Sequence, residues 1–319
     1  MNEPQNAGPG GLGGMLRSSP RVAENALAGR TVVMSGGSRG IGLAILVEAA
    51  RHGANAVILA KTDQPHPKLP GTVHTAVAEI EAAGAATGAR AVAVVGDVRN
   101  EADVQRAVDA AVETFGGIDI CVNNASAISK AGTLDLSLKQ FDLMQAINVR
   151  GTFTLTRACL PHLLKSGHAH ILTMSPPLNL SARWLGPFPA YTQTKYAMTL
   201  LTLGWAAEFA GEGIAANCLW PQTRIGTAVT LNLMGGPAAL ATARVPQIMA
   251  DAAVEILRAP PGARTGQALI DAEVLAEAGV SDLSRYGGGD NPVLDLYIDP
   301  PDGSEPSILS PREGDFPHV

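Results

Sequence analysis

Apolar residues gather in short continuous runs along this chain, and stretches with a helical period lie between the runs. The runs predict strands at 31–35, 56–60, 91–95, 118–122, 170–174, 215–219 and 268–270. Strands that are apolar throughout, rather than at alternate positions, are typical of a parallel sheet covered on both faces.

The stretches between the runs predict helices over 41–51, 72–83, 101–115, 137–165, 190–210 and 237–258. This alternation of strand and helix predicts an α/β fold, a Rossmann-type doubly wound parallel sheet of about seven strands with helices on both faces.

Composition changes at both ends of the chain. Residues 1–27 are rich in Gly, Pro, Asn and Ser and show no period, which predicts a disordered N-terminal extension. Residues 28–285 carry all the predicted elements and are expected to form a single domain. Residues 286–319 return to Gly, Pro, Asp and Ser, and predict an extended C-terminal tail that is partly ordered on the surface or on a partner subunit.

Bulk properties exclude several classes of function. The 319 residues are 46% hydrophobic and 16% charged, as in a globular protein, and the net charge of −6 gives no basic footprint for nucleic acid. No apolar run approaches the ~20 residues of a membrane span, and the N-terminus lacks a signal-peptide core. Cys121, Cys159 and Cys218 lie in apolar runs, so we expect buried thiols in a reducing compartment and a cytoplasmic protein.

A glycine-rich turn at residues 35–42 follows the first predicted strand and leads into the first predicted helix. Backbone amides at such a helix N-terminus can bind the pyrophosphate of a dinucleotide. Its glycines at 36, 40 and 42 depart from the standard dinucleotide fingerprint, so a plain turn of the chain is the alternative.

Tyr191 and Lys195 are four residues apart in a predicted helix and share one face. Bringing a phenol from a pKa of about 10 to neutrality requires roughly 4 kcal/mol of preference for phenolate. A neighbouring ammonium and a bound cationic nicotinamide supply charge of the right sign. A hydride donor together with a proton donor is the combination that a carbonyl reductase or alcohol dehydrogenase requires.

In this order and separation, the motifs resemble those of short-chain dehydrogenases/reductases over about residues 28–275. The resemblance rests on the glycine turn, Asn123-Asn124-Ala125-Ser126, Asn148 and Tyr191-x-x-x-Lys195. Segments such as Pro65-His66-Pro67-Lys68-Leu69-Pro70-Gly71-Thr72 and Ser175-Pro176-Pro177 resemble one branch, the hydroxysteroid dehydrogenase-like protein 2 group. Human-type members of that group carry an added sterol-carrier-like domain, for which we expect no room here.

The resemblance implies a dinucleotide site in the single domain. Gly36 and Gly40 would let amides approach the pyrophosphate, and Gly42 would permit close helix packing. Asp97 would accept a hydrogen bond from the adenine amine, with a plain helix N-terminal acid as the alternative. The other implied cofactor residues are Ser35, Ser38, Arg39, Ile41, Lys61, Thr62, Val98, Asn124, Ala125, Lys195, Pro221, Thr223 and Ile225.

The resemblance also implies the catalytic residues. Tyr191 would protonate the developing alkoxide, Lys195 would hold the ribose hydroxyls and favour phenolate, and Asn148 would bend its helix and bind a water. The family serine expected about thirteen residues before the tyrosine falls on Pro176 when aligned from the strand. Ser175 is the candidate catalytic serine, and Asn179 and Ser181 remain alternatives. A second departure is Pro221-Gln222, where the family has Pro-Gly.

We expect NADP(H) to be preferred over NAD(H). NAD sites place an acid about 20 residues beyond the glycine turn, whereas this chain has Lys61 nineteen residues after Gly42. Arg39 would give a second cation to a 2′-phosphate. Asp63, two residues later, argues against this preference. The alternative interpretation of Lys61 is an ordinary surface lysine.

The predicted function is interconversion of an apolar alcohol, lipid-derived compounds included, with its ketone or aldehyde. A non-catalytic dinucleotide-binding redox sensor or scaffold is the alternative. We expect a homodimer or homotetramer, with small residues Ala197, Gly204 and Ala207 at the contact, and no metal, although His168 and His170 alternate. Trp184, Phe188, Trp220 and Met234 would line either a substrate mouth or the core.

Overall fold

The computed structural model describes residues 25–66, 69–233 and 235–300. The predicted disorder of residues 1–24 and the predicted tail beyond residue 300 lie outside this part of the chain, as does Met234.

Seven parallel strands form one sheet in the order β3-β2-β1-β4-β5-β6-β7. Their bounds are β1 Thr31–Ser35, β2 Asn55–Ala60, β3 Ala91–Val95, β4 Ile120–Asn123, β5 His170–Thr173, β6 Ala215–Trp220 and β7 Ala268–Ile270. The strand order reverses between β1 and β4, which pair in parallel. The fold class predicted from the apolar runs is confirmed.

The α-helices are α1 Gly40–Arg51, α2 Val73–Ala83, α3 Glu101–Phe115, α4 Leu138–Met144, α5 Thr152–Leu163, α6 Ala182–Leu185, α7 Pro189–Glu208, α8 Ala228–Leu233, α9 Gly236–Ala241, α10 Gln247–Leu257 and α11 Asp271–Glu277. The helix predicted over 137–165 is interrupted by a π-helical segment, Gln145–Gly151. The helix predicted over 237–258 is wrong, because the chain leaves helical structure between α9 and α10 and Pro246 begins the second helix.

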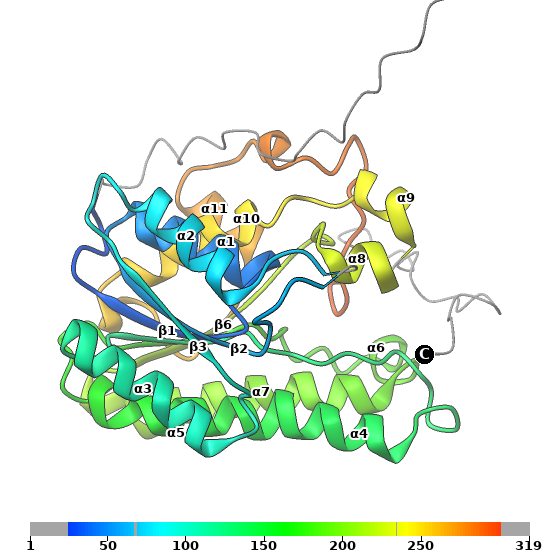
Figure 1. Ribbon diagram of the computed structural model, residues 1–319. Coiled ribbons are helices and arrows are strands. Elements are labelled where there is room, and N and C mark those ends of the chain that lie inside the picture. Colours follow the sequence, from blue (N-terminus) through cyan, green and yellow to red (C-terminus); the bar gives the residue numbers. More distant parts are fainter. Residues whose placement is uncertain (1–24, 67–68, 234, 301–319) are drawn as a thin grey trace, which may run out of the picture.

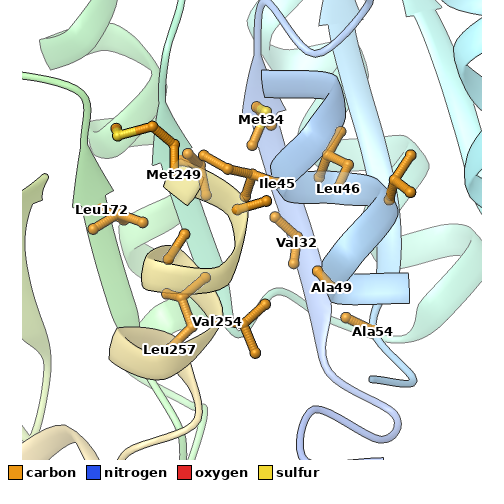
Figure 2. Packing of buried hydrophobic residues seen from close by; sticks show 14 of the residues in the cluster. Val32, Met34, Ile45, Leu46, Ala49, Ala54, Leu172, Met249, Val254 and Leu257 are labelled. Atoms are coloured by element: carbon orange, nitrogen blue, oxygen red, sulfur yellow. The ribbon is translucent and has the colours of Figure 1, made fainter. Parts of the chain in front are cut away.

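Helices cover both faces of the sheet (Figure 1). The helices α1, α2, α10 and α11 lie on one face, and α3, α5 and α7 lie on the other. The first face is closed by side-by-side packing of α1 and α10, where Ile45 points toward Met249 and α10 (Figure 2). Continuous apolar strands are required here because both faces are buried.

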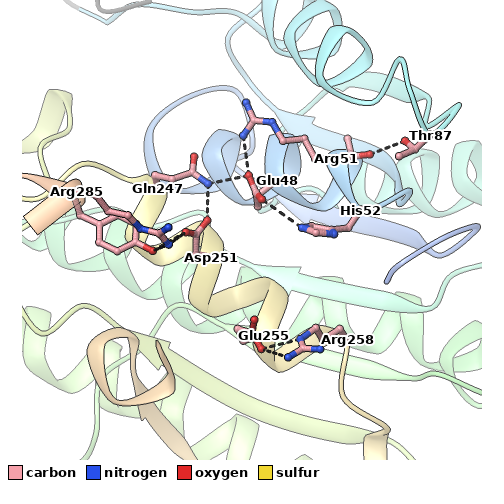
Figure 3. Close-up of polar contacts among 11 residues, drawn as sticks. Glu48, Arg51, His52, Thr87, Gln247, Asp251, Glu255, Arg258 and Arg285 are labelled. Carbon is pink, nitrogen blue, oxygen red and sulfur yellow. Dashed lines mark hydrogen bonds and ion pairs between the residues drawn. The ribbon is translucent and has the colours of Figure 1, made fainter. Parts of the chain in front are cut away.

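A buried polar cluster also joins α1 to α10 (Figure 3). Gln247 donates one amide proton to Glu48, at 2.8 Å, and the other to Asp251, at 2.7 Å. The Tyr286 hydroxyl donates to Asp251 at 2.6 Å. Tyr286 is the first residue of the predicted tail, so the cluster ties the C-terminal segment to the body of the fold.

The segment from residue 286 to residue 300 differs from the expected extended tail. Tyr286 and Tyr297 are each 1% exposed, and Leu296 is 2% exposed. Tyr297 packs in a third apolar cluster with Trp184, Tyr191 and Trp220. The domain therefore continues beyond residue 285, and its last described residues reach the tyrosine of the predicted site.

No helix within these described ranges is both long enough and apolar enough to cross a membrane.

Candidate active site

The predicted site residues meet at the carboxyl edge of the sheet. The glycine turn leaves β1, and Asn123 and Asn124 leave the neighbouring β4. The strand order reverses at this pair, and in open α/β sheets such a switch point leaves a crevice for ligands.

Backbone contact between the two loops requires glycine. Gly36 has φ +78, and a Cβ there would lie 3.0 Å from the Ala125 Cα. A Cβ on Gly42 would lie 2.5 Å from Asn124 Nδ2, which donates to the Gly36 carbonyl at 2.9 Å. The Ser35 hydroxyl accepts from the Ala125 amide at 3.2 Å. These residues therefore form one rigid unit at the N-terminus of α1.

The loop after β2 packs against the glycine turn. Arg39, the N-cap of α1, donates from Nη2 to the Gly71 carbonyl at 3.0 Å, and its buried Nε has no hydrogen-bond partner in the part of the chain described. Gly71 is itself close to Ser38, because a Cβ there would lie 2.8 Å from the Ser38 carbonyl oxygen. Thr62 accepts from the Val73 amide at 2.9 Å, which fixes the loop to α2.

Charged residues gather where this loop begins, at the end of β2. Lys61 Nζ lies 3.2 Å from an Asp97 carboxylate oxygen. Arg99 donates to both oxygens of Asp97, and this hydrogen bonding holds the pKa of the Asp97 carboxyl well below its usual range. Val98 packs beneath Gly151, where an added Cβ would lie 2.9 Å from its Cγ1. The structure thus brings Lys61 and Asp97 together as an ion pair.

Tyr191 and Lys195 lie buried on α7, with 5% and 2% of their surfaces exposed. Lys195 Nζ donates to the Met174 carbonyl at 2.6 Å and lies 5.1 Å from the Trp220 ring centroid. Burial lowers the pKa of Lys195 to about 7, and it raises the pKa of the Tyr191 phenol above its usual range. Without a ligand, the phenol is therefore held protonated.

Asn148 connects α7 to the loop after β4. Its Oδ1 accepts from the Ala127 amide at 2.7 Å, and its Nδ2 donates to the Thr194 hydroxyl at 2.9 Å. Thr194 in turn donates to the Tyr191 carbonyl at 2.8 Å. Asn148 lies in the π-helical segment, a feature that often occurs at functional sites.

Ser175 is fully buried, and its hydroxyl has no hydrogen-bond partner among the described residues. Burial raises the pKa of the Cys218 thiol, and the Ser175 hydroxyl opposes this rise. The two alternatives are engaged elsewhere, since Asn179 donates to Asp299 at 2.9 Å and accepts from Ser181 at 2.8 Å.

Ser126 was not proposed as a site residue. Its exposed hydroxyl is close enough to Tyr191 to oppose the rise of the phenol pKa. Ser126 is the last residue of the motif Asn123-Asn124-Ala125-Ser126 after β4. That position is the feature of the sequence that could have identified it as a site residue.

The loop after β6 carries Pro221, Thr223 and Ile225. Thr223 pairs with Leu294 and Ile225 pairs with Arg244 as isolated bridges. The buried Thr223 hydroxyl has no hydrogen-bond partner in the described chain. An unpaired buried hydroxyl is costly, so a polar ligand group beside it would be stabilising.

Aromatic residues close the other side of the tyrosine. Trp184, Phe188 and Trp220 belong to the same buried cluster as Tyr191, which matches the core alternative. The C-terminal segment adds Tyr297 and the carboxylate of Asp295, and burial raises the pKa of Asp295 to about 6. Neither residue was predicted from the sequence, although the apolar residues around Asp295 in 293–298 were a signal that this segment packs against the domain.

The two histidines bind backbone. His168 Nε2 lies 2.6 Å from the Leu257 carbonyl oxygen, and His170 Nε2 lies 3.1 Å from that of Ala259. Across residues 25–66, 69–233 and 235–300, no three His, Cys, Asp or Glu side chains gather as a metal site would require.

Comparison with known proteins identifies the family. Residues 30–233 match the short chain dehydrogenase family. The chain is 50% identical over 275 residues to hydroxysteroid dehydrogenase-like protein 2 of Danio rerio, covering 86% of this chain and 65% of that protein. A short chain dehydrogenase from Mycobacterium thermoresistibile has 48% identity and a TM-score of 0.80, covering 88% of this chain and 100% of that one. A putative dehydrogenase from Xanthomonas campestris has 49% identity and a TM-score of 0.78, covering 86% and 98%.

The chain belongs to the short-chain dehydrogenase family, an oxidoreductase family that uses NAD(P) cofactors. The resemblance stated from the motifs, including that to the hydroxysteroid dehydrogenase-like protein 2 group, is confirmed. The chain spans about 65% of the length of that first relative.

Burial of Ser175 leads to a prediction. Ser175→Ala should lower turnover far less than Tyr191→Phe does, because the Ser175 hydroxyl is enclosed beside Cys218. Steady-state rates on a panel of apolar aldehydes and ketones, with melting temperatures as the control, would measure this. A loss as severe as that of Tyr191→Phe, at unchanged melting temperature, would show that Ser175 is the ordinary family serine shifted in register.

Proposed function

We propose that this protein is an NADP(H)-preferring oxidoreductase that interconverts an apolar alcohol and its ketone or aldehyde. The observation that carries the proposal is the buried pair of Tyr191 and Lys195 on α7, which the loop after β4 links to the glycine turn. A buried ammonium is costly unless it is compensated, and a site that retains one beside a buried phenol is suited to proton transfer.

The residues present fit a dinucleotide. The turn at Gly36 and Gly40 exposes backbone at a helix N-terminus, and buried polar atoms of Arg39 and Thr223 await partners. Ser35, Ser38, Ile41, Gly42, Asn124 and Ala125 would shape the same cradle, with Thr62, Asp97 and Val98 at the adenosine end and Pro221 and Ile225 at the nicotinamide end. The bound nicotinamide would supply the hydride.

The protein's own groups would handle the proton. The Tyr191 phenol, protonated in the free protein, would donate to the substrate oxygen as negative charge develops there. Lys195 would leave the Met174 carbonyl to hold ribose hydroxyls, and its ammonium would stabilise the phenolate left behind. Asn148 would keep the loop after β4 and α7 in register.

We predict that Tyr191→Phe abolishes turnover but leaves dinucleotide affinity nearly intact, while Lys195→Ala loses both. The phenol would touch only the reacting oxygen, whereas the lysine would both favour phenolate and grip the cofactor. Loss of a general acid typically costs about 10²–10⁴ in rate. NADPH consumption and fluorescence titration would separate the two effects, and full activity of Tyr191→Phe on a verified substrate would refute the mechanism.

The NADP(H) preference is proposed from cations near the adenosine end. Arg39 and Lys61 flank the loop after β2, and Lys61 is 64% exposed, free to leave its 3.2 Å contact with Asp97 for a phosphate. Charge-assisted hydrogen bonds to phosphate are among the stronger polar contacts.

Lys61→Ala should therefore weaken NADPH binding by roughly tenfold and change NADH binding little, as expected for one lost charged contact of about 1.4 kcal/mol. Lys139→Ala, an exposed lysine on α4, is the matched control and should change neither affinity. Tighter binding of NADH than NADPH by the wild-type protein would contradict the assignment.

A homo-oligomer is proposed from the exposed face of α5 and α7. Phe153 is 45% exposed and Leu200 is 58% exposed, and an added Cβ on Gly204 would meet nothing. Ala197 and Ala207 lie along the same helix, where small side chains permit close approach. A second copy of this chain, with the same face, is the proposed occupant.

Light scattering should show a particle larger than the 32.8 kDa chain at micromolar concentration. Leu200→Glu should shift it toward the monomer, because a carboxylate would be buried in the contact. Lys165→Glu, outside this face, is the control. A wild-type protein that is only a monomer would contradict the proposal.

The non-catalytic alternative rests on the enclosed position of Ser175, which leaves the usual substrate-binding hydroxyl in doubt. It would be favoured if the dinucleotide bound tightly but no aldehyde or ketone of the panel led to NADPH consumption.

A further inference from the structure

The C-terminal segment lies against the start of the helix that carries Tyr191 and Lys195. The Asp295 amide donates to the Gln222 carbonyl at 3.0 Å, and Trp220 Nε1 donates to the Leu296 carbonyl at 2.9 Å. The Tyr297 hydroxyl lies 3.2 Å from that of Thr192, the residue after Tyr191. Residues 295–297 are thus held between the loop after β6 and the start of α7.

These anchors hold the Asp295 backbone beside the loop after β6, and its carboxylate is within electrostatic reach of both Tyr191 and Lys195. Trp220, bonded to the residue after Asp295, also presents its ring to the Lys195 ammonium at 5.1 Å. One Asp295 oxygen accepts from the Leu296 amide at 2.7 Å. Within the described chain, this is the only hydrogen bond of the carboxylate. Among the same residues its negative charge is not paired in a short ion pair, and it acts on the charged groups nearby.

Charged and titratable groups from several elements surround this carboxylate. Those within electrostatic reach of it are Lys130, Tyr191, Lys195, Arg224, Asp271 and Tyr297. Lys130, Lys195 and Arg224 favour the ionised form of Asp295, while burial opposes it. Asp295 is accordingly a carboxylate that lies within electrostatic reach of both the cations and the phenol of the site.

We propose that Asp295 is a positioning residue of the active site, whose negative charge holds Tyr191 and Lys195 in their protonated, proton-donating state. This inference rests on the proposed function. A nearby anion disfavours a phenolate and favours an ammonium, so the same charge acts in one direction on both groups.

The negative charge of Asp295 would have opposite effects on reduction and on oxidation. Carbonyl reduction starts from the protonated phenol, and alcohol oxidation starts from the phenolate. Asp295 would therefore raise the pH at which oxidation begins and preserve reduction to higher pH. Because the pKa of Asp295 is about 6, the effect would be present above that pH and lost as the carboxylate is protonated below it.

The test is the ionisation of Tyr191 measured through its near-ultraviolet phenolate absorption, with NADP⁺ bound. Subtracting the titration of Tyr191→Phe isolates this tyrosine from the other three of the chain's 4 tyrosines. Asp295→Asn keeps the oxygen that accepts from Leu296 but removes the charge. Its Tyr191 midpoint should fall by roughly 0.5 to 1 pH unit, which is about a 3- to 10-fold gain in phenolate below the midpoint.

Two variants on the same segment separate charge from packing. Asp299→Asn weakens the contacts with Trp184 and Arg183, so it should lower the melting temperature without moving the Tyr191 midpoint. Asp290→Asn removes an exposed charge and should change neither. A midpoint unchanged in Asp295→Asn, or moved equally by Asp299→Asn, would overturn the inference.

The outcomes also separate this inference from the proposed function. If Tyr191→Phe keeps full turnover, the proposed function fails and the role of Asp295 fails with it. If Tyr191→Phe is inactive but the titrations of the wild type and Asp295→Asn coincide, the proton-transfer mechanism stands and only Asp295 is excluded.

Discussion

Burial of the Lys195 ammonium is the constraint on which the rest of the site depends. A charge removed from water is costly unless nearby groups compensate it. Here the Met174 carbonyl accepts from it, the Trp220 ring lies beside it, and Asp295 opposes the fall of its pKa. Each of these comes from a different part of the chain: the end of β5, the end of β6 and the C-terminal segment.

The helix that carries Tyr191 and Lys195, α7, is also joined to the rest of the site by hydrogen bonds. Asn148, in the π-helical segment, bonds both the loop after β4 and Thr194, and Thr194 bonds the backbone of Tyr191. The loop after β4 is in turn locked to the glycine turn through Asn124. A continuous set of hydrogen bonds thus runs from the proposed pyrophosphate seat to the proposed proton donor.

Much of the fold was predictable because the strands are short, mostly apolar runs, and the central strands are buried on both sides. The position of Tyr191 and Lys195 on one helix followed from the apolar period of 190–210, and their shared face followed from the spacing of four residues. Pro246 was the signal that 237–258 is not one helix, because proline ends or begins helices. The burial of Ser175 depends on how the chain turns after β5, which spacing does not determine.

The C-terminal segment was missed for a physical reason. Gly and Pro on both sides of residues 293–298 made composition favour a tail, but the run between them is apolar except for Asp295. Its burial depends on contacts with Trp184, Trp220 and Thr192, which are distant in sequence. Whether the single acid in this run, Asp295, lies near the site depends on the tertiary structure, so its sequence context does not predict it.

The most direct test of the central claim is a crystal structure with NADP⁺ and an unreactive ketone bound. We expect the Tyr191 hydroxyl to donate to the ketone oxygen and Lys195 Nζ to leave the Met174 carbonyl for the ribose hydroxyls. A complex in which Lys195 stays on Met174, and the ketone oxygen lies against residues other than Tyr191, would contradict it.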